Sequence, residues 1–375
     1  MQWNLKKMLP AAATALVSFT SLANAQSETA QMRNLENRVT ALEQRKGASG
    51  MINPPGRPQV RNGADLFIYG DLLYWNAHEN GLFYAIENDS ATPSSNLAEA
   101  EVKNIHGKWN WGFRVGAGYN MPHDGWDIRT TWLRFTDNAK KHARAEDADD
   151  AVFPTLASPF NRIANDETCQ RAKAHWRFRL DQVDLDMGRE FFVSKWLTLR
   201  PHGGLRTDWI HQKLNTEYKN FAGTATPNEV EVELKDRWWG IGLEAGLDTQ
   251  WGLGGGWSVF GNMTAAIIYG FHHLDFDEEN TPASAVTTSS GKFIDLDNHY
   301  RISHPVLDIA MGLRWDNMFS DDRVHLGLQV GWEHHVYFSQ NQFPNFVDDV
   351  NLGKFVVNQG DLTLQGWTFS ARLDF

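Results

Sequence analysis

The chain has 375 residues and carries 35 lysines and arginines against 46 aspartates and glutamates, so its formal net charge is −11. This acidic balance argues against a nucleic-acid-binding protein, because contacts to phosphates need a basic face. The sequence beyond residue 25 has no stretch of roughly 18 uninterrupted apolar residues, which excludes a membrane protein built of helices. The single cysteine excludes an intramolecular disulfide framework and a metal site made of several cysteines.

Residues 1–25 have the pattern of a secretory signal peptide. Lys6 and Lys7 precede an apolar stretch, and Ala23 and Ala25 supply the small residues of a cleavage site. A membrane anchor is the alternative interpretation, but the apolar stretch is short for a membrane span. We therefore expect the chain to be exported and cleaved after Ala25.

Residues 26–46 are predicted to form a short coiled-coil helix, because apolar residues recur at steps of three and four with charged residues beside them. The oligomerisation set is Met32, Leu35, Arg38, Val39, Leu42 and Glu43. Two heptads are marginal alone, so the helix needs partners, and we expect a homotrimer. A frayed leader is the alternative. The prolines and glycines of 47–64 indicate a linker.

From residue 65 to residue 375 the sequence alternates with the period of a β-strand. In 109–120 every second residue is apolar, and glycine, asparagine and arginine lie between them. The pattern recurs in 239–251, 307–315, 324–332 and 367–375. The apolar faces begin or end with aromatic residues, as the interfaces of a bilayer require. This predicts an all-β fold, a transmembrane antiparallel β-barrel of the bacterial outer membrane. A soluble secreted β-protein is the alternative, because its strands also alternate.

The sequence predicts ten strands, near 65–77, 107–120, 125–136, 174–189, 196–211, 234–250, 256–272, 299–317, 322–338 and 360–375. Short connections alternate with long ones, and in outer-membrane barrels the short turns face the periplasm. Further strands within the long connections, for which 81–88 is a candidate, would raise the count to 12, 14 or 16. We also expect a bulge at Pro201 and another between Leu180 and Val183, where the alternation changes phase.

The last strand resembles the terminal signal of outer-membrane proteins, which implies recognition by the barrel-assembly machinery through Trp367, Phe369 and Phe375. Three strings resemble the chlamydia- and legionella-type major outer membrane protein family, namely FIYGDLLYW at 67–75, RPHGGLR at 200–206 and GWEHH at 331–335. The likeness covers 65–375. It implies a pore-forming surface protein in contact with outer-membrane lipid. The cysteine cross-links of chlamydial members are not implied, because this chain has only Cys169.

The charged faces of the predicted strands point into the barrel. The pore-lining set that we expect is Arg114, Arg129, Arg177, Arg179, Arg200, Arg206, Glu244, Asp248, Asp308, Asp316 and Glu333. Arginines favour one wall and carboxylates the other, which would set up a field across the pore. The alternative is that these charges pair across strands and fill a narrow lumen. Strand number separates the two hypotheses, because ten strands leave little room for water and 16 leave a channel.

We therefore expect a porin that passes small hydrophilic solutes and ions. The alternative is a surface adhesin or structural protein that acts through the long connections, with ligands on a host surface. We expect no cofactor, no metal site and no enzyme. Adjacent histidines at 272–273 and 334–335 point to opposite faces of a strand, and Asp208 near His211 has no serine nucleophile motif beside it. Cys169 is expected to be a free thiol in a long connection.

Overall fold

The computed structural model describes residues 53–89, 100–122, 124–147, 150–159, 168–221, 227–282, 291–347 and 354–375. The predicted signal peptide, the coiled-coil helix and the first part of the linker lie outside these residues, so the homotrimer stays a prediction. Every named element of the described chain is a β-strand. In these residues we find no helix with the length and apolar character of a membrane span.

Ten long strands form a closed antiparallel barrel, as the sequence predicts. They are β1 (Leu66–Glu79), β4 (Trp109–Asn120), β5 (Trp126–Arg144), β7 (Cys169–Arg189), β9 (Leu197–Phe221), β10 (Pro227–Gly254), β11 (Trp257–Pro282), β12 (Gly291–Phe319), β13 (Val324–Asn341) and β16 (Gly360–Asp374). The first strand pairs with the last, since β1 lies between β16 and β4. The ring is completed by β7, which pairs with both β5 and β9.

The shorter strands add to the two ends of the barrel. They are β2 (Phe83–Asn88), β3 (Ala100–Asn104), β6 (Ala151–Pro154), β8 (Phe191–Phe192), β14 (Pro344–Phe346) and β15 (Phe355–Val357). The candidate strand at 81–88 is therefore real, but it pairs with β3 and β6 and does not enter the ring. The count of ten barrel strands is unchanged.

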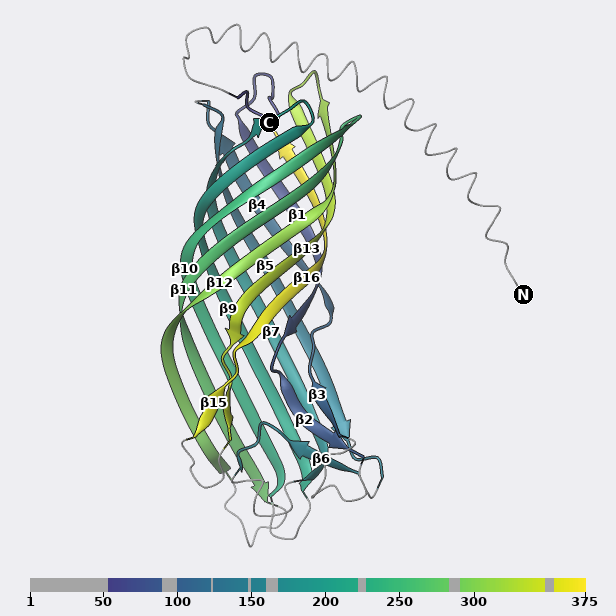
Figure 1. Ribbon diagram of the computed structural model, residues 1–375, viewed down its shortest axis with the longest axis vertical. Coiled ribbons are helices and arrows are strands. Elements are labelled where there is room, and N and C mark those ends of the chain that lie inside the picture. The colour runs from purple at the N-terminus through teal and green to yellow at the C-terminus, as the bar shows by residue number, and fades with distance from the viewer. Residues whose placement is uncertain are drawn as a thin grey trace, which may run out of the picture.

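The two ends of the barrel differ in character (Figure 1). The short turns and the C-terminus lie at the upper end, while β2, β3, β6 and β15 lie toward the lower end. The start of β1 pairs with the end of β16, so both ends of the barrel sequence lie on the side of the short turns. By the rule for outer-membrane barrels, that side faces the periplasm.

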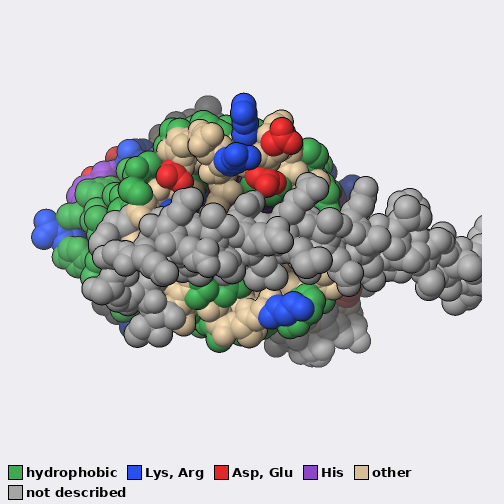
Figure 2. Space-filling view, turned by 90° about the horizontal axis from the view of Figure 1, so that it is seen from above, with side chains coloured by type: hydrophobic (Ala, Val, Ile, Leu, Met, Phe, Trp, Pro, Cys, Tyr) green, Lys and Arg blue, Asp and Glu red, His purple; other side chains and the backbone are tan. Residues whose placement is uncertain are grey.

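Part of the predicted linker is docked on the periplasmic end. Pro55 forms a β-bridge with Phe191, and the backbone N–H of Arg61 donates to the carbonyl of Asp322. The described segment thus runs from the turn before β9 to the turn before β13. Figure 2 looks onto this end, where acidic and basic side chains gather inside a rim that carries apolar ones.

Several barrel strands are much longer than predicted, because their two faces exchange character partway along. In β9 the even-numbered side chains point inward throughout, and they change from polar (Arg200, Arg206) to apolar (Ile210, Leu214). The outward side chains change in the opposite sense, from Leu205 and others to charged residues such as lysine and glutamate. A prediction based on one apolar face ends the strand where that face becomes polar.

The two expected bulges are absent from the described pairing. Between Leu180 and Val183 the register of β7 with both neighbours is unbroken, so the change of phase marks the exchange of faces. Pro201 pairs with Leu247 in continuous register on its β10 side. On the other side it lies between the last pair with β7, at His202, and the pairs with β8, where β9 needs no ladder donor.

An apolar belt surrounds the part of the barrel next to the short turns. Its outward side chains are large and exposed, as in Trp111, Leu243, Ile267 and Met311, and Leu243 is 71% exposed. Trp239 and Phe271 stack at its upper limit. In water such a surface would be a severe aggregation hazard, whereas lipid covers it without cost.

We predict that Leu243→Arg lowers the free energy of unfolding by about 2–4 kcal/mol, the penalty for a cation facing the middle of the bilayer. Glu231→Arg changes the same face of β10 above the belt and should cost less than about 0.5 kcal/mol. Urea unfolding in phospholipid vesicles measures both. Equal losses in the two variants would mean that Leu243 does not face lipid.

Candidate functional site

The barrel interior inside the apolar belt is a charged lumen around a cavity of about 230 Å³. Eight of the predicted pore-lining side chains line it, namely Arg114, Arg129, Arg200, Arg206, Glu244, Asp248, Asp308 and Glu333. Asp316 also lies on the inner side, where it accepts hydrogen bonds from Arg314 and contacts His325.

Arg177 and Arg179 are not in the lumen, contrary to the prediction. Both lie on the exposed outer face of β7, between the buried side chains Trp176, Phe178 and Leu180. This part of β7 lies above the belt, where water contacts the outer face and the arginines belong outside. Arg179 pairs there with Asp181 of its own strand.

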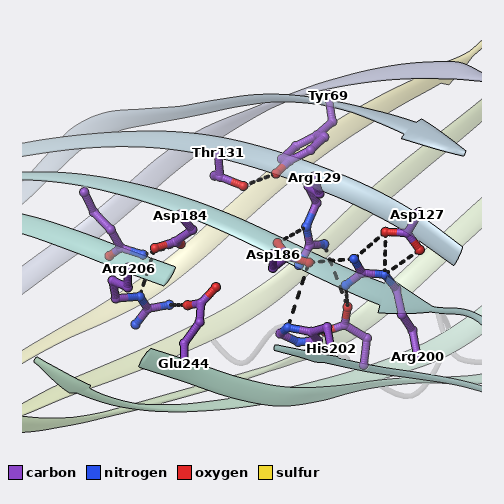
Figure 3. A network of polar contacts seen from close by, with 12 residues as sticks. Tyr69, Asp127, Arg129, Thr131, Asp184, Asp186, Arg200, His202, Arg206 and Glu244 are labelled. Carbon is purple, nitrogen blue, oxygen red and sulfur yellow. Dashed lines mark hydrogen bonds and ion pairs between the residues drawn. The ribbon is translucent and has the colours of Figure 1, made fainter. Parts of the chain in front are cut away.

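Arg200 is held by carboxylates of three other strands (Figure 3). Its guanidinium contacts Asp127 of β5 in a two-nitrogen arrangement, Asp186 of β7 at 2.6 Å and Asp248 of β10 at 3.2 Å. Asp186 also accepts a hydrogen bond from Arg129 at 2.9 Å. A planar guanidinium has donors enough for such a cluster, which explains why arginine occupies these positions.

Arg206 forms the second cluster, deeper in the barrel. It contacts Asp184 of β7 at 3.0 Å, Glu244 of β10 at 3.1 Å and Asp308 of β12 at 2.5 Å. The side chain is almost fully buried. The contact with Asp308 reaches past the two strands between β9 and β12, so it bridges part of the lumen and does not merely link neighbours.

A chain of charged groups continues from Asp308 across the interior. Nδ1 of His335 lies 2.8 Å from Asp308, and its Nε2 lies 3.1 Å from Glu333. Glu333 then accepts a hydrogen bond from Arg114, which also pairs with Asp71. Because both ring nitrogens of His335 face carboxylate oxygens, the ring fits this chain as an imidazolium that donates at each end.

These contacts match the second hypothesis for the lumen and replace the first. The arginines do not form a row opposite a row of free carboxylates, since each one described above is already bound to carboxylates of other strands. Paired ions of this kind brace the walls against one another. Sequence analysis found the arginines but not their partners, because inter-strand register cannot be read from alternation alone.

Above the belt the interior is an apolar core. Leu73, Trp75, Phe135, Trp176, Phe178 and Trp238 are among its buried side chains. Trp75 packs against Phe135 with ring centroids 5.8 Å apart, and Trp176 packs against Phe178 at 5.5 Å. In the described part of the chain, this core fills the barrel on the extracellular side of the charged lumen. No single strand announced it, because the core needs the exchange of faces in several strands.

Two polar chains lie within this core. Gln212 donates to Glu79 at 2.8 Å and accepts from the indole of Trp176. Burial is the main cause that raises the pKa of Glu79, to about 8, and the nearby Asp236 adds to it. Asp236 contacts Nδ1 of His272, whose Nε2 lies 2.8 Å from His304. Such groups are tolerated inside an apolar core only where hydrogen bonds satisfy them.

The remaining candidate residues are separated by the strand geometry. Asp208 points inward and His211 outward, so they do not form a pair. His272 is buried while His273 lies on the outer face, and His335 is buried while His334 faces outward. Cys169 begins β7 and does not lie in a loop, and burial raises the pKa of its thiol to about 12. A thiol with so high a pKa is a poor nucleophile.

Comparison with known proteins places the chain among outer-membrane proteins. A model of the family described as the Legionella pneumophila major outer membrane protein precursor matches residues 57–375. No curated protein matches the sequence.

Among solved structures, the outer membrane protease OmpT of Escherichia coli is 7% identical, with a TM-score of 0.43 over 85% of this chain and 99% of that one. The attachment invasion locus protein Ail of Yersinia pestis is 9% identical, with a TM-score of 0.24 over 84% and 100%. A FadL homologue of Pseudomonas aeruginosa is 7% identical, with a TM-score of 0.25 over 88% and 96%.

We predict that Arg206→Ala destabilises the folded barrel by about 3–5 kcal/mol, because it leaves several buried carboxylates without their cation. Arg179→Ala is the matched control, since it removes an exposed pair whose contribution is about 0–1 kcal/mol. Urea unfolding in vesicles gives both values. Similar losses would show that the lumen cluster is not a brace.

A second prediction concerns the pH dependence that Glu79 contributes. The folded protein keeps this proton up to a pKa of about 8, whereas the ordinary value is 4.5. Its contribution is therefore fully present below pH 4.5 and is lost as the pH rises through 8, at no more than about 1.4 kcal/mol per unit. Glu79→Gln should remove this slope and stabilise the protein at pH 8. A wild-type slope that persists in the variant would assign it elsewhere.

Proposed function

This chain belongs to the Legionella major outer membrane protein family, and we propose that it acts as a closed surface platform in the outer membrane. The barrel anchors the molecule in lipid and holds the long connections above the membrane, where they bind ligands on a host surface. The observation that carries this proposal is the apolar core above the belt, because an open diffusion pore needs water in that region.

The core favours a closed state energetically. Exposing one large buried apolar side chain to water costs about 1.5–3 kcal/mol, and a passage through the core would expose several, including Trp75, Trp176 and Trp238. The ten-stranded ring is also narrow, and side chains alone fill a barrel of about eight strands. Both points support a solid post over a channel.

The outer surface above the belt is suited to a rigid stalk in water. Glu233 of β10 pairs with Lys213 of β9 and Lys235 of its own strand. Burial would raise the pKa of Glu233, but the hydrogen bonds from these lysines outweigh it and lower the pKa to about 2. Charged ladders of this type keep the exposed sheet soluble and discourage pairing with other strands.

Conduction of small ions is the second candidate function, and the polar cavity favours it. Eight carboxylates and six arginines line the cavity, together with His202 and His335. A transient opening of the apolar core would connect this cavity to the outside. The slight excess of acidic groups favours cations in such a path.

We predict that the purified full-length protein gives no steady conductance in planar lipid bilayers. Replacing residues 89–99 and 283–290 by short Gly-Ser links should abolish binding of protein-bearing vesicles to host cells while the barrel stays folded. Inserting the same links into the periplasmic turn at 320–323 is the control and should leave binding intact.

A steady wild-type conductance whose ion selectivity shifts in Arg206→Glu would overturn the platform proposal and support a porin. Unchanged cell binding after both loop replacements would place the binding surface elsewhere on the molecule.

A further inference from the structure

Four metal-ligating side chains meet on the outer face of the barrel, just above the apolar belt. His273 of β11 lies directly opposite His299 of β12. Two residues further along the same face, Asp275 lies directly opposite Asp297. The four residues thus occupy two successive cross-strand pairs, which places their side chains side by side.

The distances between their polar atoms suit one metal ion. Ligand atoms of His273, Asp297 and His299 all lie within 4.8 Å of one another. Nε2 of His273 is 3.2 Å from Asp275 and 3.7 Å from Asp297, and Nε2 of His299 is 3.2 Å from Asp297. With metal–ligand bonds of about 2.0–2.2 Å, the edge of a tetrahedral zinc site is roughly 3.3–3.6 Å.

The count of protons indicates a missing cation. The Nδ1 atoms of His273 and His299 lie 2.6 Å apart, so they share one proton between them. If both rings are neutral, the ring that donates this proton has a bare Nε2. For either ring, that bare nitrogen faces carboxylate oxygens of Asp275 or Asp297, and lone pairs then oppose one another. A cation at this point removes the repulsion.

We propose that His273, Asp297 and His299, with Asp275 beside them, bind a divalent transition-metal ion of the zinc class. Imidazole nitrogen and carboxylate oxygen are donors that zinc accepts in tetrahedral sites. The sequence alone gave no sign of the site, because His299 is 26 positions from His273 and only the strand register brings them together. This inference is independent of the proposed function.

The position of the site gives the metal a structural role. In the described residues, pairing between β12 and β13 begins at Val306, so the first part of β12 pairs only with β11. A metal ion bound across His273 and His299 would clamp this half-supported strand to its one partner. Arg237 competes for Asp275, which it contacts at 2.8 Å, so we assign Asp275 the weaker share of the coordination.

The test is isothermal titration of ZnCl₂ into the full-length protein in detergent, after removal of any purification tag. We expect a binding event that EDTA reverses. His273→Ala and His299→Ala should each weaken it more than about tenfold, the loss typical of a damaged metal site. His211→Ala is the matched control, since this exposed outer-face histidine of β9 pairs across strands with Arg179 and Arg237.

Hydrogen exchange gives a second measurement that does not depend on the variants. Zinc should slow amide exchange in 291–301 and leave the middle of the apolar belt unchanged. Zinc binding of equal strength in wild type and in the His273→Ala, His299→Ala double variant would overturn the proposal. The absence of zinc-dependent heat in the wild-type protein would overturn it as well, and would assign the cation between the rings to a proton.

Discussion

The structure depends on one constraint, which is that each long strand passes through two solvents. Within the bilayer, lipid requires apolar side chains outside, so polar ones must face the lumen. Above the bilayer, water reverses the demand, and the apolar side chains turn inward. β9 to β11 satisfy both demands without a break in register, because the inward positions stay the same and only their chemistry changes. The charged lumen and the apolar core are two halves of one arrangement.

The charged half is stable only because its ions are paired. A guanidinium out of water loses several kcal/mol of hydration, which well-placed carboxylates recover. In the lumen, Arg200 and Arg206 each bind carboxylates of three other strands, so the pairing also fixes the positions of the walls. A free field across an open pore would need these charges unpaired and hydrated, and ten strands give little room for that water.

The parts of the molecule that were predictable follow from local alternation. It gives the barrel, the ten strands and the inward direction of residues such as Arg114 and Glu333. It fails where its assumption fails, at the upper limit of the belt. There the apolar face moves from outside to inside, so strand ends were placed too early and Arg177 and Arg179 were assigned to the wrong face. Cross-strand partners such as His335 and Asp308 need the register, which one sequence does not contain.

The same constraint explains how the barrel tolerates an unpaired edge. In the described residues, the first part of β12 lacks a β13 partner, and an exposed edge of this length invites pairing with other chains. Its side chains include Lys292, Asp295 and Asp297, which are exposed, and charge on an edge opposes such pairing. These residues can be charged because this stretch lies above the bilayer. The acidic groups that protect the edge also supply the ligands that would hold it to β11, so solubility and metal binding draw on the same side chains.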